Sequence, residues 1–138
     1  MGKIIVVKEV VTETAHRLPN YEGACRNIHG HSYRWQVGVS GEVDKTTGMI
    51  IDFKVLKNIM QRHIIDPFDH KLILSVYDGD FCYEGCDITI FDMAPTVENF
   101  VLHVATVISN SVSLKSFNGI LEFVRCWETE KSYAEWRA

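Results

Sequence analysis

The chain has 138 residues and a hydrophobic fraction of 46%, so we expect residues 1–138 to form a single globular domain with its own core. Its 14 basic and 18 acidic residues give a formal net charge of −4, which argues against a general nucleic-acid binder. No apolar run is long enough to span a membrane and the N-terminus has no signal-peptide pattern, so we expect a cytoplasmic protein whose four cysteines are free thiols.

The first part of the chain predicts two long strands. Residues 3–14 are rich in Val and Ile, which favour a strand. Pro19 and Gly23 mark a loop over residues 15–23. Over residues 32–43, apolar and polar side chains then alternate, which is typical of a second strand with one buried face.

A helix is expected in the middle of the chain, after a turn and a short strand over residues 49–51. Asp52 is a good N-cap for a helix over residues 53–65, where apolar side chains recur at helical spacing. His63 lies on that apolar face and is expected to be half-buried rather than a ligand. Asp66-Pro67 is expected to end the helix.

The second half of the chain predicts one more helix. Residues 75–87 are rich in Gly and Asp and indicate a loop or hairpin, whereas Pro95-Thr96 favours a helix start. Strands are expected over residues 88–91 and 120–127, and the polar tail shows no clear pattern. This order predicts an α+β fold with long antiparallel strands and helices on one face.

The stretch Cys25-Arg26-Asn27-Ile28-His29-Gly30-His31 carries the strongest chemical signal. Two histidines two positions apart point to the same side of an extended backbone, and His16 supplies a third imidazole upstream. Such a pair alone is more often made of ordinary surface or core histidines. Three imidazoles without an obvious fourth protein ligand are typical of a catalytic zinc site, and a nearby cation would favour the thiolate of Cys25.

Several motifs follow one another in a particular order: His16, Cys25-x-x-x-His29-Gly-His31, Gly48-x-x-x-Asp52-Phe53, Asp69-His70, Pro95-Thr96-x-Glu98-Asn99 and Glu128-Thr129. This series resembles the 6-pyruvoyl-tetrahydropterin synthase / 6-carboxytetrahydropterin synthase family. The resemblance implies a tunnelling fold (T-fold), with antiparallel strands and two helices per subunit. It also implies rings of subunits that stack as a homohexamer, with active sites between subunits.

The resemblance implies a role for each matching residue. Zinc would be held by His16, His29 and His31, and proton transfer would be carried by Cys25, Asp69 and His70, the last two from a neighbouring subunit. Glu128 would anchor the pterin, with Thr96 and Glu98 as further substrate contacts. The alternatives are a buried structural thiol for Cys25, a turn for Asp69-His70, a strand-end carboxylate for Glu128, and helix-start chemistry for Thr96 and Glu98.

The gap between Cys25 and His29 resembles that of the carboxy branch, which serves queuosine and other deazapurine synthesis. The resemblance therefore implies a lyase that converts 7,8-dihydroneopterin triphosphate to 6-carboxy-5,6,7,8-tetrahydropterin, acetaldehyde and triphosphate. The alternatives are the pyruvoyl synthase, which eliminates triphosphate without cleaving the carbon chain, and a non-catalytic zinc- or pterin-binding oligomer.

Two further features of the sequence bear on the site. Residues 75–94 are longer than expected for the carboxy branch and contain Cys82-x-x-x-Cys86, which we interpret as two free thiols rather than a second metal site. Cys126 lies in an apolar strand and is expected in the core. The candidates for binding the triphosphate are Arg17, Arg26, Arg34 and Lys71.

Overall fold

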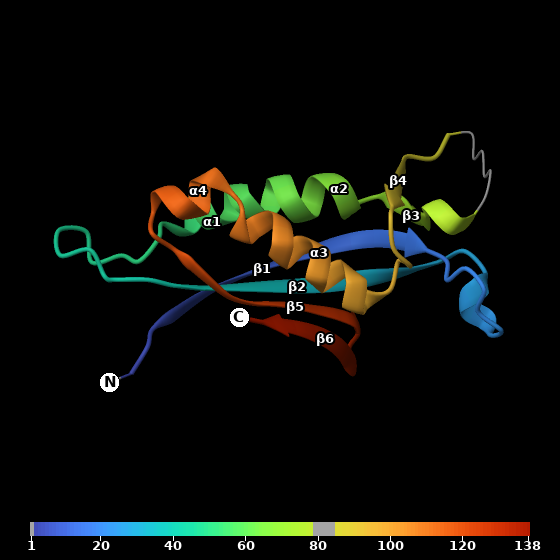
Figure 1. Cartoon of the computed structure of the whole chain (residues 1–138), viewed down its shortest axis with the longest axis horizontal. Helices are drawn as coiled ribbons and strands as arrows, with labels where there is room; N and C mark the ends of the chain where they lie inside the picture. The colour runs from blue at the N-terminus through green and yellow to red at the C-terminus, as the bar shows by residue number, and fades with distance from the viewer. Residues whose placement is uncertain (1, 79–84) are drawn as a thin grey trace.

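The computed structural model describes residues 2–78 and 85–138, and shows a curled sheet with its helices on one face (Figure 1). The strand order is β4-β3-β1-β2-β5-β6. The strands are β1 (Ile5–His16), β2 (His29–Ser40), β3 (Lys71–Ser75), β4 (Ile88–Phe91), β5 (Ile120–Thr129) and β6 (Ser132–Arg137). The helical segments are η1 (Ala24–Arg26), α1 (Phe53–Met60), η2 (Gln61–Ile65), α2 (Asp66–Phe68), η3 (Val76–Asp78), α3 (Val97–Ser109) and α4 (Val112–Ser116).

The two long strands predicted near the N-terminus are confirmed, and they pair antiparallel along their whole length. The register runs from Ile5 opposite Ser40 to His16 opposite His29. Both strands reach further toward the loop between them than expected, so His16 and His29 are strand residues. Even-numbered side chains of β1 and odd-numbered side chains of β2 face the helices, because successive side chains of a strand alternate between its faces.

The expected α+β class and the placement of helices on one face are confirmed, but the sheet is mixed rather than purely antiparallel. β3 pairs parallel to both β1 and β4. Its Leu72, Ile73 and Leu74 are all buried, so the strand shows an apolar run instead of an alternation. The tail also forms β6 against β5, whereas the short strand expected over residues 49–51 is absent.

The first predicted helix begins where expected and ends later. The Asp52 side chain accepts a hydrogen bond from the Lys54 N–H at 2.8 Å. The helix widens into a π-helical segment at η2 and continues to Phe68 instead of ending at Asp66-Pro67. The Asp66 N–H bonds to the Gln61 carbonyl and the Asp69 N–H bonds to the Ile65 carbonyl, so helical turns continue on both sides of Pro67, which has no N–H.

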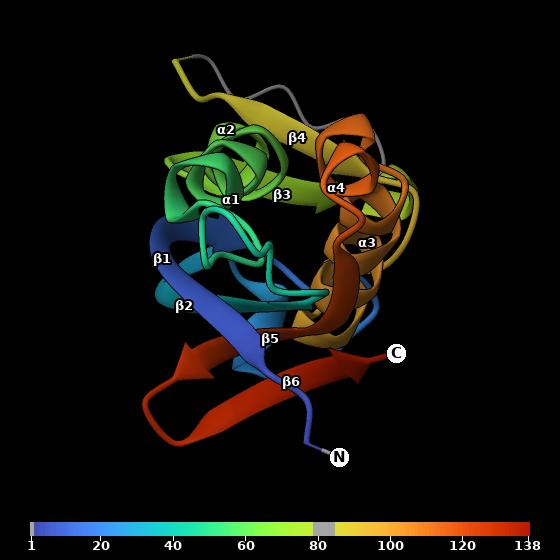
Figure 2. The same ribbon diagram turned by 90° about the vertical axis from the view of Figure 1, so that its left-hand side faces the viewer.

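The second predicted helix, α3, begins after its Thr96 N-cap as expected, and the short α4 follows it. Figure 2 shows α3 beside the sheet, whose opposite face carries no helix. Phe100 of α3 is fully buried in the core, and its ring centroid lies 5.0 Å from that of Phe68 and 5.6 Å from that of Tyr33. No helix among residues 2–78 and 85–138 is long and apolar enough to cross a membrane.

Candidate metal centre and active site

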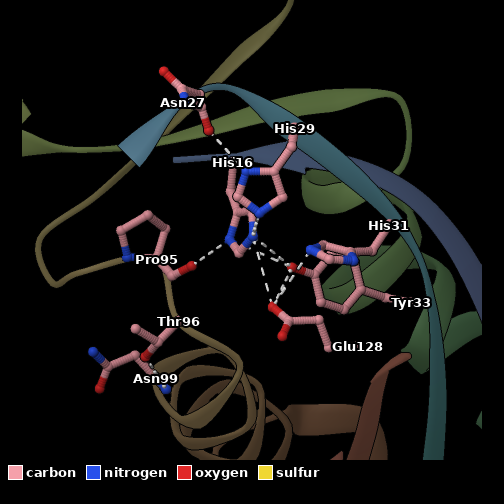
Figure 3. Close-up of polar contacts among 9 residues, drawn as sticks. All are labelled: His16, Asn27, His29, His31, Tyr33, Pro95, Thr96, Asn99 and Glu128. Atoms are coloured by element: carbon pink, nitrogen blue, oxygen red, sulfur yellow. Dashed lines mark hydrogen bonds and ion pairs between the residues drawn. The ribbon is translucent and has the colours of Figure 1, made fainter. Parts of the chain in front are cut away.

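Three histidines converge at one end of the sheet (Figure 3). His16 is the last residue of β1, and His29 and His31 are the first and third residues of β2. The antiparallel register places all three on the helix-covered face, where their ligand atoms lie within 4.8 Å of one another. The structure thus brings together the residues that the sequence indicated as metal ligands.

Backbone carbonyls fix the ring orientation of two of these histidines. The Nδ1 atom of His16 donates to the Pro95 carbonyl at 2.7 Å, and that of His29 donates to the Asn27 carbonyl at 2.7 Å. Because a carbonyl oxygen can only accept, both rings carry a proton on Nδ1 and turn an Nε2 lone pair toward each other at 3.0 Å. Such a pair is repulsive unless a proton or a metal ion lies between the nitrogens.

Burial favours the metal ion over the proton. Desolvation lowers the pKa values of His16 and His31, so these rings are neutral near pH 7. The Nε2 atom of His31 is buried, and no residue among 2–78 and 85–138 forms a hydrogen bond with it. Neutral imidazoles with their second nitrogens held by carbonyls are the usual donors of a protein metal site, so the residues present fit a divalent ion such as zinc.

Glu128 and Tyr33 lie beside the three histidines. Glu128 comes two residues after the buried Cys126 on β5, so its side chain leaves the same face of the sheet. Its Oε1 atom accepts a hydrogen bond from the Tyr33 hydroxyl at 3.3 Å. The same oxygen lies 3.6 Å from His16 Nε2 and 3.7 Å from His31 Nε2.

The role of Tyr33 was missed from the sequence, where this residue was only one apolar position of a strand. The alternation that places His31 inward also places Tyr33 inward, and it is fully buried. Burial, then the Glu128 charge, raises the pKa of Tyr33, so its hydroxyl stays protonated and donates.

Cys25 lies on the loop between His16 and His29, within the short helix η1. It is a half-buried free thiol, and its backbone carbonyl accepts a hydrogen bond from the Leu18 N–H at 2.9 Å.

Asp69 and His70 form a pair outside the three-histidine cluster. The Asp69 carboxylate accepts from His70 Nδ1 at 3.0 Å and from the Glu13 N–H at 2.9 Å, while the His70 N–H donates to the Glu13 carbonyl at 2.7 Å. Partial desolvation raises the pKa of Asp69, but the hydrogen bonds from Glu13 and His70 lower it further. The pKa of Asp69 therefore lies below its usual value.

The His70 ring is turned to solvent, with 78% of the side chain exposed. It helps to line a hollow of about 390 Å³ together with the outward-facing Glu13 and Ser32. Glu13 and Ser32 leave the strands on the face opposite to His16 and His31. His31 also borders this hollow, and the exposed His70 ring lies outside the three-histidine cluster.

The segment before α3 positions the metal centre mainly through its backbone. The Thr96 side chain accepts from the Asn99 N–H at 3.3 Å and caps the helix, and the Asn99 side chain donates to the Ala94 carbonyl at 2.9 Å. These bonds present the Pro95 carbonyl to His16, a contact that has no side-chain signal in the sequence. Glu98 is exposed in the first turn of the helix.

The four basic candidates have different surroundings. Arg17 pairs with Asp78 at 3.3 Å and Lys71 with Asp87 at 3.4 Å. Arg34 pairs with Glu9 at 3.2 Å and lies 4.0 Å over the Trp127 ring, and Arg26 is exposed at the end of η1.

The positions of two further cysteines and of His63 can be compared with the sequence expectations. Cys86 is exposed and free, Cys126 is buried in the core, and His63 is half-buried as expected. Cys82 lies outside the described residues.

The chain is similar to known proteins over nearly its whole length. Residues 5–138 match the sequence model of a family described as 6-pyruvoyl tetrahydropterin synthase. A 6-carboxy-5,6,7,8-tetrahydropterin synthase of Haemophilus influenzae is 31% identical over 142 residues, covering 96% of this chain and 97% of that protein. The human 6-pyruvoyl tetrahydrobiopterin synthase is also 31% identical, over 112 residues, covering 80% of this chain and 68% of that protein.

The fold is similar as well. The structure of the Caenorhabditis elegans 6-pyruvoyl tetrahydropterin synthase superposes with a TM-score of 0.75 at 27% identity, covering 100% of this chain and 97% of that chain. This similarity confirms the T-fold expected from the motifs.

Proposed function

The chain belongs to the 6-pyruvoyl tetrahydropterin synthase family, and from this premise we propose that it is a zinc-dependent carbon–carbon lyase. The proposed reaction converts 7,8-dihydroneopterin triphosphate to 6-carboxy-5,6,7,8-tetrahydropterin and releases acetaldehyde and triphosphate. The similarity to the Haemophilus influenzae synthase over 97% of its length supports this branch of the family. We place the reaction in queuosine and deazapurine synthesis in the cytoplasm, carried out by residues 1–138 as one domain.

The observation that carries the proposal is the pair of Nε2 lone pairs 3.0 Å apart on His16 and His29. With His31, these rings would hold the zinc ion. When bound, zinc would act as a Lewis acid that polarises the hydroxyl groups of the substrate side chain.

Cys25 is the residue that we expect to take the proton from the substrate side chain. Its loop runs between the first two metal-binding residues, and it is half-buried. A thiolate next to a bound cation is favoured electrostatically, and its proton affinity suits transfer from an acidified carbon or hydroxyl group.

Asp69 and His70 would complete the site of a neighbouring subunit. The carboxylate fixes the His70 Nδ1 proton, so Nε2 is left to give or take a proton. Because this ring is exposed and lies outside its own three-histidine cluster, it is free to reach a second copy of the chain. This arrangement supports a homo-oligomer, and we propose the hexamer that the family resemblance implies.

Glu128 is proposed to anchor the pterin, whose paired N–H donors match a carboxylate. Its position beside the histidines on β5 supports this role. Thr96 and Glu98 stay in the proposal as substrate contacts near the start of α3, although Thr96 already caps that helix.

The alternative function is the pyruvoyl synthase. The human enzyme of that name has the same identity to this chain, but the match covers 68% of its length. The three residues between Cys25 and His29 favour the carboxy branch.

The test is to incubate the zinc-loaded protein with 7,8-dihydroneopterin triphosphate and to assay acetaldehyde and triphosphate together. Release of both supports the lyase, whereas triphosphate without acetaldehyde supports the pyruvoyl synthase. Neither product from protein with bound zinc would support a non-catalytic oligomer. The matched control is Cys25→Ala, which should abolish turnover and keep the zinc.

A further inference from the structure

We infer that Glu128 is a fourth metal ligand of this protein when no substrate is bound, and that substrate must displace it. The inference rests on the proposed metal site. It adds to Glu128 a role that differs from holding the pterin ring.

The distances around Glu128 Oε1 match a shared coordination sphere. Ligands at about 2.0–2.1 Å from a tetrahedral zinc ion lie roughly 3.3–3.4 Å from one another. Oε1 lies 3.6 Å from His16 Nε2 and 3.7 Å from His31 Nε2, and His16 Nε2 lies 3.0 Å from His29 Nε2. The three histidine nitrogens lie within 4.8 Å of one another, and rotation of the Glu128 side chain toward His29 would bring its carboxylate oxygen into the fourth position.

The surrounding residues hold the carboxylate in this orientation. The Tyr33 hydroxyl donates to the same Oε1 atom at 3.3 Å, and this phenol is fully buried. Figure 3 shows the Glu128 side chain directed toward His16 and His31, with Tyr33 beside it. A ligand carboxylate with a hydrogen-bond donor on its oxygen is the normal arrangement around a protein metal ion.

Charge also favours the contact. An imidazole that binds a metal through a nitrogen lone pair is a neutral donor, so three histidines leave the full charge of a divalent ion uncompensated. Glu128 is the carboxylate that pairs with two of these rings. Direct binding would reduce the net charge of the metal complex itself by one, which lowers the cost of holding that complex in a half-buried site.

The consequence is an exchange of partners at Glu128. A substrate that offers hydroxyl oxygens to the metal and ring N–H groups to the carboxylate satisfies both at once. A hydroxylated ligand without such N–H donors would have to displace Glu128 without compensation, so it would bind weakly.

The experiment compares cobalt(II)- and zinc-loaded proteins in the absence of substrate. Glu128→Gln should change the visible absorption spectrum of the bound cobalt, because a direct ligand is lost. It should also weaken zinc binding by at least ~10-fold in competition with a chelator. The matched control is Glu122→Gln, which removes a carboxylate from the same strand where it pairs with Lys3, and should change neither quantity.

A second variant tests whether the Tyr33 hydroxyl holds the Glu128 carboxylate in place. Tyr33→Phe removes only the hydroxyl, and it should weaken zinc binding less than Glu128→Gln does. Unfolding of the metal-free variants by urea checks that each is folded.

The inference is overturned if Glu128→Gln leaves the cobalt spectrum unchanged, even if the variant binds the metal more weakly. That result would mean that Glu128 attracts the ion through space without binding it directly. If the unaltered protein binds no metal at all, the proposed metal site itself fails. The two failures are therefore distinguishable without measuring turnover.

Discussion

The Nε2 atoms of His16 and His29 lie 3.0 Å apart, and each ring already donates its Nδ1 proton to a backbone carbonyl. A cation between them removes the repulsion of the two lone pairs. Because burial lowers the pKa of His16, a metal ion is favoured over a shared proton near neutral pH. The fold thus holds the two rings in a geometry that a metal ion would stabilise.

The first prediction concerns metal binding and stability. The protein should bind one zinc ion per chain, and free zinc at 100 times its Kd should stabilise the fold by about 2.7 kcal/mol. The ion should raise the thermal midpoint, and a chelator should reverse the change. His29→Ala should abolish both effects, because it removes one of the paired nitrogens.

The matched control for this prediction is His103→Ala, which removes a histidine on α3 that packs against Phe91. This variant should keep stoichiometric zinc. Retention of one zinc ion per chain by His29→Ala would refute the ligand set.

Local sequence patterns were enough to predict the long strands and both main helices. β1 is rich in Val and Ile, β2 alternates between apolar and polar side chains, and Asp52 and Thr96 are strong caps. β3 was missed because it is short and buried on both faces, so it has no alternation. β6 was missed because its partner β5 stabilises it, and no local pattern reports that pairing.

The sequence motifs predicted which histidines lie together, but not what surrounds them. The carbonyls of Asn27 and Pro95 orient two rings, and a backbone acceptor leaves no residue signature. The face on which His70 lies was also hidden, because it depends on its positive φ of 55° and on backbone contacts to Glu13. The inward position of Tyr33 could have been read from its spacing to His31.

The second prediction tests whether Asp69 and His70 act in a neighbouring subunit. Cys25→Ala and His70→Ala chains should each be inactive alone. Chains unfolded together and refolded as mixed oligomers should regain activity, because some sites then combine an intact Cys25 with an intact His70. Random mixing of equal amounts should restore roughly a quarter of the sites.

The control for the mixing experiment combines Asp69→Asn with His70→Ala chains. Both variants lack a residue that the same subunit must supply to the site, so this mixture should not regain activity. Absence of recovery in the mixed Cys25→Ala and His70→Ala oligomers would show that both residues act within one chain.

The third prediction concerns pH and two histidines outside the metal centre. Burial lowers the pKa values of His63 and His103, so the unfolded chain binds more protons than the folded chain just below pH 6.5. Stability should therefore fall as pH falls through this range and level off below the folded pKa values. The double variant His63→Gln/His103→Gln should lose less stability between pH 7.5 and 5.5.

The measurement for this prediction is the urea midpoint of each protein at the two pH values, in the same metal state. Asn58→Gln on α1 is the surface control, because it changes an exposed side chain that does not titrate, and it should leave the loss unchanged. An equal loss of stability in the double variant and the parent would contradict the assignment of this pH dependence to His63 and His103.

The last prediction links the core to the metal centre through Phe100. This ring is fully buried, and its centroid lies 6.1 Å from that of His16. Phe100→Ala should destabilise the fold by about 3–5 kcal/mol, since it leaves a cavity among aromatic rings. It should also weaken zinc binding, because the cavity relaxes the packing that holds His16.

Phe100→Leu fills most of that cavity and should recover much of both losses in urea unfolding and chelator competition. Val112→Ala is the surface control, since Val112 is 82% exposed, and its effect should be within about 0.5 kcal/mol. Full zinc affinity in a folded but destabilised Phe100→Ala protein would show that the Pro95 carbonyl and the strand register position His16 without help from the core.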